Sequence, residues 1–100
     1  MSAKSSLPLP KRLKAARLAA KMTQENLGIA AGLDEHVASA RMSQYENAVH
    51  TPDYNFVRQL AKILKMPTAY FYCEEDELAE MIASYGKHAV DGPSMPTPSR

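Results

Sequence analysis

Between Thr23 and Glu46 the chain reads TQENLGIAAGLDEHVASARMSQYE. The hydroxyl of Thr23 can cap the first turn of a helix, and Gly32 can adopt the left-handed conformation in which helices often end. A second helical pattern closes at Glu46, with short polar side chains between apolar ones. Two helices joined at a bend that contains glycine predict a helix-turn-helix over this part of the chain.

The composition is that of one globular domain. The chain has 100 residues, of which 45% are hydrophobic, enough for a single modest core. No apolar stretch approaches the ~20 residues that a membrane span needs, and the first residues lack the pattern of an export signal. We therefore expect a cytoplasmic protein without a membrane partner. Cys73 is the one cysteine, which excludes an internal disulfide and a multi-cysteine zinc site.

Charge divides unevenly along the chain, although the formal net charge is only +1. Residues 1–65 carry ten lysines and arginines against five acidic residues, whereas residues 66–100 carry two against six. The basic part contains the predicted helix-turn-helix. Such asymmetry favours a molecule that lays one face on phosphate and keeps another away from it.

An earlier helix is expected from about Pro10 to Lys21, because Pro8 and Pro10 are suited to a helix entrance. The residues expected in its buried stripe are Leu9, Leu13, Ala16 and Ala20. Those expected in water are Lys11, Arg12, Lys14 and Lys21. In the next helix, from about Thr23 to Ala31, Gly28 stands where only a very small side chain lets another helix approach closely.

Further helices are expected after Pro52. The first runs from about Asp53 to Lys65, with Phe56 outside its core stripe. The residues of that stripe are Tyr54, Val57, Leu60, Ala61 and Leu64. A short helix follows from Thr68, and a last one ends near Tyr85. The apolar face of the last helix consists of Leu78, Met81, Ile82 and Tyr85. This face either packs on its own domain or forms a two-fold interface.

The domain is expected to span residues 9–85. Residues 1–8 are predicted to form a flexible arm, because residues 1–6 are small and polar and have nothing to pack. Residues 86–100 are predicted to be a disordered tail, because a segment so rich in proline, serine and glycine cannot build a core.

An ordered set of residues connects these helices with a known family. The set is Thr23-Gln24-Glu25, Leu27, Ala31-Gly32-Leu33, Met42-Ser43, Tyr45-Glu46-Asn47 and Pro52. It resembles the Cro/repressor helix-turn-helix family, also called the xenobiotic-response-element or lambda-repressor-like type, over about residues 9–72. The resemblance implies an all-α bundle of five or six short helices that binds double-stranded DNA and regulates transcription, most simply as a repressor that occludes polymerase.

The turn between the two helices departs from the family pattern, because it contains four extra residues within Asp34-Glu35-His36-Val37-Ala38. One alternative is an early helix capped by Asp34. The other is a longer loop, with the recognition helix starting near Ser39. We favour the loop, because two carboxylates at the DNA-facing end of a recognition helix would repel phosphate.

The resemblance also implies which residues contact DNA, when positions are counted back from Glu46 in a recognition helix at about Ser39–Asn47. Those implied at bases are Ser39, Ala40 and Gln44, with Arg41 and Ser43 at neighbouring base or backbone positions. Their chemistry is suitable, since glutamine pairs with adenine, arginine reaches guanine or phosphate, and alanine packs on a thymine methyl. Those expected at phosphates are Gln24, Asn47 and, as in relatives, the backbone of the loop from Asn47 to Asp53.

Arg17 and Glu46 match positions that form an ion pair in the family, which ties the first helix to the end of the recognition helix. The implied role is structural. Removing one partner of a buried pair would cost ~3–5 kcal/mol, whereas an exposed pair would contribute ~0–1 kcal/mol.

Other functional classes have little support. The chain shows no nucleophile-base set or phosphate-binding glycine loop, and His36 and His50 lack a ligand spacing, so no enzyme activity, metal or cofactor is expected. No small-molecule ligand is evident, since there is no second domain to hold one. A homodimer is expected, because a two-fold pair can read half-sites about 34 Å apart. The alternative function is a protein-interaction module, such as the antitoxin or regulatory subunit of a toxin-antitoxin pair.

Overall fold

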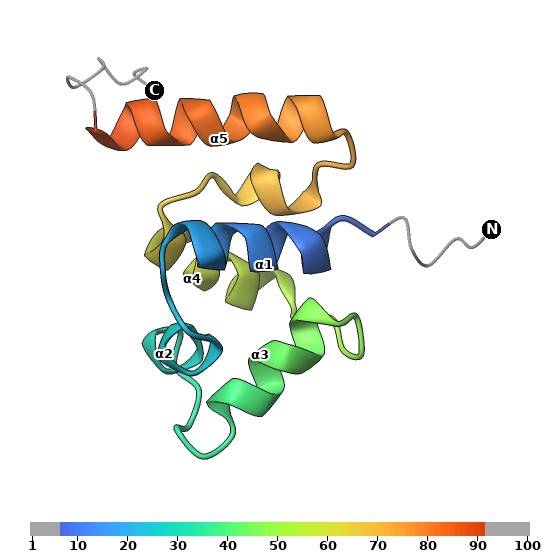
Figure 1. Ribbon diagram of the computed structural model, residues 1–100, viewed down its shortest axis with the longest axis vertical. Helices are drawn as coiled ribbons and strands as arrows, with labels where there is room; N and C mark the ends of the chain where they lie inside the picture. The colour runs from blue at the N-terminus through green and yellow to red at the C-terminus, as the bar shows by residue number, and fades with distance from the viewer. Residues whose placement is uncertain (1–6, 92–100) are drawn as a thin grey trace.

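The computed structural model describes residues 7–91, and side chains through Gly86. Its helices are α1 (Leu9–Ala19), α2 (Gln24–Ala30), α3 (Ala38–Glu46), α4 (Tyr54–Leu64), the 3-10 helix η2 (Thr68–Tyr72) and α5 (Asp76–Asp91) (Figure 1). Within this range no residue belongs to a β-strand, and the predicted all-α fold is confirmed. None of these helices is long and apolar enough to cross a membrane.

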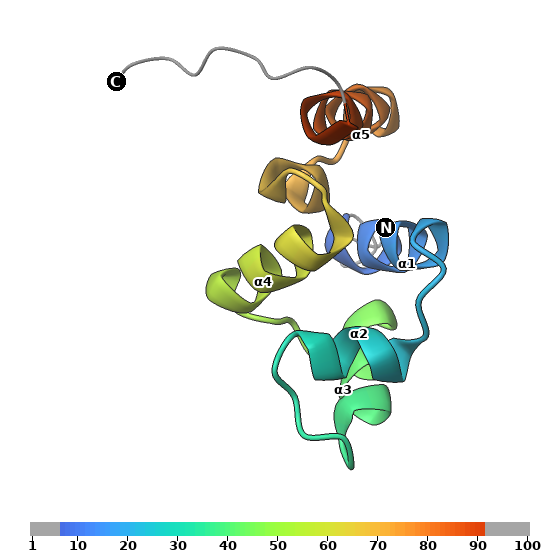
Figure 2. The same cartoon turned by 90° about the vertical axis from the view of Figure 1, so that its left-hand side faces the viewer.

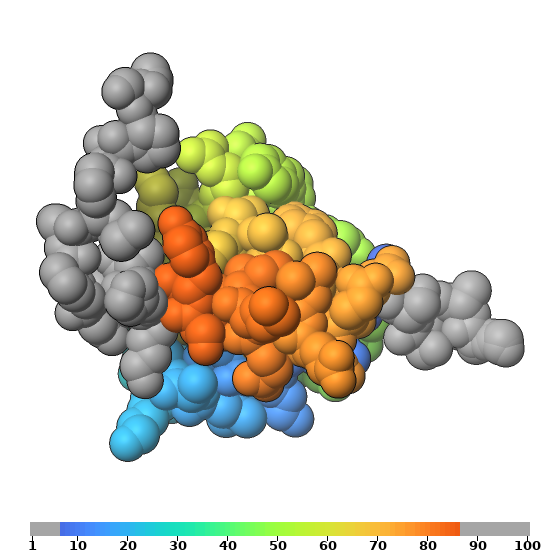
Figure 3. All heavy atoms as spheres, turned by 90° about the horizontal axis from the view of Figure 1, so that it is seen from above, coloured from blue at the N-terminus to red at the C-terminus, as the bar shows by residue number. Residues whose placement is uncertain are grey.

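The helices are stacked along the longest axis of the molecule. α2 and α3 lie together at one end, α1 and α4 form the middle, and η2 and α5 form the other end (Figures 1 and 2). Seen from the α5 end, that helix is the outermost layer (Figure 3). The predicted helix-turn-helix and the last helix are therefore at opposite ends.

The core contains side chains from α1, α2, α3, α4 and η2. Its largest fully buried side chains are Phe71, Leu13, Leu27, Met42, Leu60 and Val57. Tyr45 joins this cluster from α3, next to Met42. Burial of these apolar side chains, at roughly 1.5–3 kcal/mol each, is what holds the five elements together.

Two helices begin at side-chain caps. Thr23 Oγ1 accepts a hydrogen bond from Asn26 N at 2.9 Å, and Asp53 Oδ1 accepts one from Phe56 N at 2.8 Å. Each cap satisfies one of the amides that the first turn leaves without a partner. The predicted cap at Thr23 is confirmed.

The helix ends were harder to predict than the starts. Positive φ angles occur at Lys21 (59°), Gly32 (103°), Ala48 (63°) and Lys65 (57°). Each follows a helix, and the next residue donates its amide back into the last turn, as Val49 N does to Gln44 O at 2.8 Å. This closing turn is typical of glycine, and three of the four residues are not glycine. For that reason α1 ends at Ala19 and not near Lys21.

Three expectations about exposure were wrong. Arg12 was expected in water but is buried, because its guanidinium donates to the carbonyl oxygen of Cys73, far along the chain. Ala20 is exposed, because α1 has already ended. Tyr54 is 59% exposed, while Phe56 packs on Tyr45 with ring centroids 5.6 Å apart. The first turn of α4 therefore turns Phe56, and not Tyr54, toward the core.

α5 packs on its own domain and also keeps an apolar surface exposed. Ala79 is buried, and Ile82 packs against the core. The other residues of the predicted apolar face are exposed. Those exposed residues are Leu78, Met81 and Tyr85. The helix was expected to end near Tyr85 but continues to Asp91, into the segment expected to be a disordered tail. A Cβ at position 86 would lie 2.4 Å from Pro67 Cδ, so the glycine lets α5 close against this proline.

The expected arm and tail fall mostly outside the described residues. Of the arm, Leu7 is exposed and Pro8 is buried directly before α1. Residues 92–100 of the expected tail lie beyond the described range.

Candidate nucleic-acid interface

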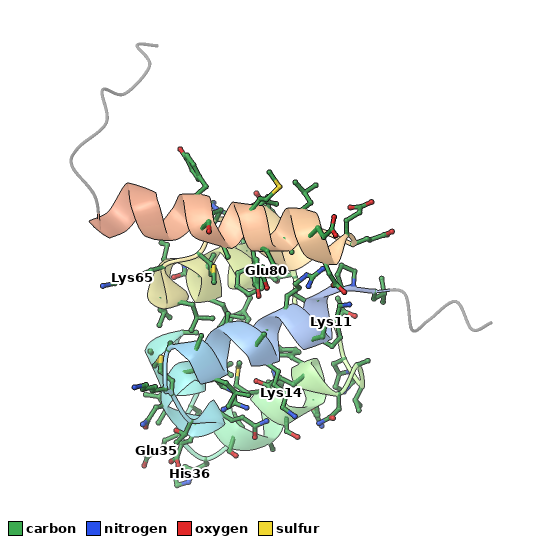
Figure 4. All side chains as sticks on the ribbon, turned by 45° about the horizontal axis from the view of Figure 1, so that its top comes forward. Lys11, Lys14, Glu35, His36, Lys65 and Glu80 are labelled. Atoms are coloured by element: carbon green, nitrogen blue, oxygen red, sulfur yellow. The ribbon has the colours of Figure 1, made fainter. Side chains whose placement is uncertain are left out.

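The turn between α2 and α3 is a loop closed on itself. Asp34 Oδ1 accepts a hydrogen bond from His36 N at 2.7 Å, and Val37 N donates to Asp34 O at 3.0 Å. α3 begins only at Ala38, so the longer loop is confirmed and the early helix capped by Asp34 is wrong. Glu35 and His36 lie at the tip of this loop, at the end of the molecule that carries α3 (Figure 4).

α3 presents its polar side chains away from the core. Met42, Tyr45 and Ala38 are buried on its inner side. The residues predicted to contact bases lie on the other side, where Ser39, Ala40 and Arg41 are exposed and Ser43 and Gln44 are half-buried. The helix stands at the edge of the bundle, with no other element outside it (Figure 1). The five residues therefore lie outside the core, spread over the outer half of the helix.

The packing of α2 against α3 depends on Gly28. A Cβ at this position would lie 2.9 Å from Ala38 Cβ, 3.0 Å from Met42 Cγ and 3.1 Å from Ala38 O. The last of these atoms is backbone and cannot turn away. The predicted close approach at Gly28 is confirmed, and it sets how far α3 stands from α2.

A buried ion pair joins α1 to the end of α3. Arg17 Nε lies 2.6 Å from Glu46 Oε2, and Arg17 Nη2 donates to Glu46 Oε1 at 3.1 Å. The two side chains are 10% and 3% exposed. Arg17 Nη1 also donates to Met22 O at 2.9 Å, in the link before α2. This two-pronged contact holds the helix-turn-helix against α1 in one orientation.

Comparison with solved structures shows what this chain is similar to. No known family model matches the chain, and no curated protein matches it. Among solved structures, the crystal structure of the transcriptional regulator BswR is 51% identical in sequence, with a TM-score of 0.76. The match covers 78% of this chain and 77% of that one. This chain belongs to the BswR family.

In the present chain, a relative of BswR, the two side chains expected at phosphates are held by internal hydrogen bonds. Gln24 Nε2 donates to Glu46 Oε1 at 3.1 Å, so its amide joins the ion pair. Asn47 Nδ2 donates to Ser43 O at 2.8 Å and to Ser43 Oγ at 3.2 Å, which closes the last turn of α3. Gln24 is half-buried and Asn47 is exposed. Both stand at ends of helices in the helix-turn-helix.

A shallow polar depression lies beside α3. It has a volume of about 430 Å³ and is lined by Arg41, Gln44, Tyr45, His50 and Thr51. The side chains of His50 and Thr51 were not among the predicted contacts, although the backbone of their loop was. The signal that would have found them is the closing turn at Ala48, which brings the following loop back to Gln44. This turn forms at an alanine and not at a glycine, so the sequence alone does not indicate it.

The acidic side chains around the start of α5 form a cluster at one end of this family member. The acidic side chains Glu74, Glu75, Glu77 and Glu80 are exposed around the start of α5, at the opposite end from α3. Lys11 and Lys14 lie on α1 between the two ends (Figure 4). Lys11 is bound to Asp76 at 3.0 Å, so its charge is already matched. Within residues 7–91 no group of histidine, cysteine or acidic side chains could hold a metal ion.

Proposed function

We propose that this member of the BswR family is a sequence-specific, double-stranded DNA-binding repressor of transcription, of the Cro/repressor type. Support comes mainly from α3, a helix that is anchored inward by Met42 and Tyr45 and exposes a polar face at one end of the molecule. A major groove about 12 Å wide admits such a helix. The related BswR is a transcriptional regulator.

In this proposal α3 enters the major groove and carries the sequence specificity. Gln44 pairs with adenine through its amide, Ala40 packs on a thymine methyl, and Ser39 donates or accepts at the leading end of the helix. Ser43 and Arg41 occupy neighbouring base or backbone positions. A good two-pronged contact of this kind contributes roughly 1–3 kcal/mol of discrimination.

Gln24 and Asn47 contact phosphates on either side of the groove in this proposal. Their amide donors now serve Glu46 and Ser43, so each must exchange or share that bond when DNA binds. Repression follows by occlusion of the promoter.

We further propose that the protein acts as a homodimer. One α3 spans only a few base pairs, and a two-fold arrangement would present two reading helices to half-sites about 34 Å apart. Such a dimer predicts an operator with inverted repeats.

A second candidate function is a protein-interaction module, such as the antitoxin or regulatory subunit of a toxin-antitoxin pair. The observation that favours it is the exposed apolar surface of α5, where Met81 is 67% exposed and Tyr85 is 66% exposed. Exposed apolar residues that cluster are a mark of interaction surfaces. Binding through this surface would be independent of α3.

Selection of bound sequences from a random duplex pool tests the proposal. We expect one enriched motif with inverted half-sites, and affinity that falls steeply as salt rises. Gln44→Ala should weaken binding to the selected duplex by about 5- to 150-fold, the equivalent of ~1–3 kcal/mol. The matched control is Gln59→Ala, an exposed glutamine on α4 that should leave affinity unchanged. Equal enrichment of all sequences, or unchanged binding by the double variant Gln44→Ala/Arg41→Ala, would contradict it.

A further inference from the structure

A second depression lies between the end of α4 and the later part of α5, and we call it the α4–α5 groove. Its volume of about 400 Å³ is within the range of small-molecule sites. The lining includes Lys62, Lys65, Met66, Pro67, Tyr85 and Gly86. Both charged residues of the lining are lysines, and no acidic residue belongs to it. The groove therefore combines an apolar surface with positive charge.

The apolar floor of the groove is fixed by the packing of α5 on Pro67. A Cβ at position 86 would lie 2.4 Å from Pro67 Cδ and 3.0 Å from Pro67 Cγ, so the two segments meet because residue 86 is a glycine. Gly86 is buried, and Met66 packs against the core. Tyr85 is 66% exposed and forms a wall of the groove. A ligand would meet a surface that is already formed, so little ordering remains to be done on binding.

The two lysines stand at the end of α4, where the backbone is closed by its own hydrogen bonds. Lys65 has a φ of 57°, and its amide donates to Lys62 O at 3.3 Å. Met66 N donates to Ala61 O at 2.9 Å. The end of a helix carries a partial negative charge of roughly half a unit, which two ammonium groups outweigh. The local field at this end of the groove therefore favours an anion.

The charges of these lysines are not matched by ion pairs in the described part of the chain. Both side chains are exposed, and Lys65 projects away from the body of the molecule (Figure 4). The ion pairs formed among the described residues involve Lys11, Arg12 and Arg17, and neither lysine of the groove takes part in one. Two ammonium groups beside an apolar floor match the two parts of an organic anion, a charged head and a hydrocarbon body.

We propose that the α4–α5 groove binds a small organic anion with an apolar body, of the kind represented by a medium-chain carboxylate. Lys62 and Lys65 hold the carboxylate, while the hydrocarbon chain lies on Met66, Pro67 and Tyr85. No small-molecule ligand was expected from the sequence, which has no second domain to hold one. Because α3 lies at the other end of the molecule from α5, this site goes beyond the proposed function and can be filled while DNA is bound (Figure 1).

Titration of the full chain with octanoate, followed by two-dimensional NMR, tests the proposal. The amide signals of Lys65, Met66 and Gly86 should shift together and saturate, with an affinity in the millimolar range that suits a small ligand in an open groove. Octanol has the same hydrocarbon body without the charge and should bind severalfold more weakly. Octylamine carries the opposite charge and should bind least. Hexanoate lacks two methylenes and should bind up to about tenfold more weakly than octanoate.

Variants separate the part of the groove that binds the charge from the part that binds the hydrocarbon. Lys62→Gln and Lys65→Gln should each weaken octanoate binding by roughly two- to fivefold, as expected for exposed charge pairs, and leave octanol binding unchanged. Tyr85→Ala should weaken both ligands, because it removes a wall that the hydrocarbon touches. The matched control is Lys14→Gln on α1, which should change neither. All four side chains are exposed, so each variant should remain folded.

Three results would overturn the inference. Equal binding of octanoate and octylamine would mean non-specific contact with exposed apolar surface. Shifts centred on Leu78 and Met81, with none at Gly86, would place the ligand on the outer surface of α5. A second copy of the chain is the competing occupant of the groove, and in that case the signals of Met66 and Gly86 would shift with protein concentration before any ligand is added.

Discussion

At the scale of single residues, Glu46 is an acidic residue with a buried side chain. Its carboxylate is 3% exposed and accepts hydrogen bonds from Arg17 and Gln24. A charge so enclosed is tolerated only while its partners stay in place. The ion pair therefore holds α3 in place, since either side chain without the other would be a buried charge with no partner.

Replacing Glu46 tests this directly. Glu46→Ala should lower the free energy of unfolding by about 3–5 kcal/mol, because it strands the guanidinium of Arg17. Urea denaturation measures the change. Glu25→Ala, on the exposed face of α2, is the control and should stay within about 0.5 kcal/mol. A loss below ~1 kcal/mol for Glu46→Ala would mean that the pair behaves like an exposed one.

At the scale of elements, the distance between α2 and α3 is set by the missing side chain of Gly28. Gly28→Ala improves helix propensity by about 1 kcal/mol but forces contacts that cost about 1–3 kcal/mol. The contact at 3.1 Å to Ala38 O is with backbone, so we expect net destabilisation and a displaced α3. DNA affinity should fall more than stability does, which parallel denaturation and binding measurements would show.

Gly32→Ala is the matched control for this element. It strains a φ of 103° but meets no atom within 4 Å, so it should lower stability by about 1–2 kcal/mol without moving α3. Folded Gly32→Ala should bind DNA as the wild type does. If both alanine variants reduced affinity equally, the spacing of the two helices would not be the cause.

At the scale of the whole molecule, Arg12 joins the start of the chain to its last helix. Its Nε and Nη2 donate to Cys73 O at 3.1 and 2.9 Å, and Nη2 lies 3.0 Å from Asp76 Oδ1. Arg12→Met should destabilise the protein by about 1.5–3 kcal/mol, because the Cys73 carbonyl loses a charged donor. Hydrogen exchange should speed up most in η2 and α5. Exchange that increases uniformly along the chain would contradict this local role.

The stability contributed by this junction should depend on pH. The hydrogen bond from Lys11, then that from Arg12, lowers the pKa of Asp76 from its ordinary value of 3.8. A lowered pKa in the folded state means that the contact stabilises above about pH 4 and that this contribution is lost as pH falls through the folded pKa. Asp76→Asn should therefore be less stable than the wild type at neutral pH, with the difference vanishing in acid. A difference that persisted at pH 2 to 3, on the order of its neutral value, would show another cause.

Local patterns were enough to predict much of this protein. The cap at Thr23 and the inward turn of Met42 and Tyr45 follow from patterns within one or two helical turns, whereas the close approach at Gly28 is made to Ala38 of the next helix. Their physical causes, capping and a 3.6-residue period, act over the same short distances. The residues expected on the outer face of α3 were implied by the resemblance to the Cro/repressor family, with positions counted back from Glu46.

Tertiary structure decided what depends on residues far apart in the chain. The burial of Arg12 is determined by the carbonyl of Cys73, and the depression at His50 by a closing turn at a non-glycine residue. Neither feature can be predicted from the local sequence, because arginine and alanine both occur in many kinds of local structure. Hydrophobic periodicity placed the helices, but only packing them together determined which polar groups met and which surface stayed open.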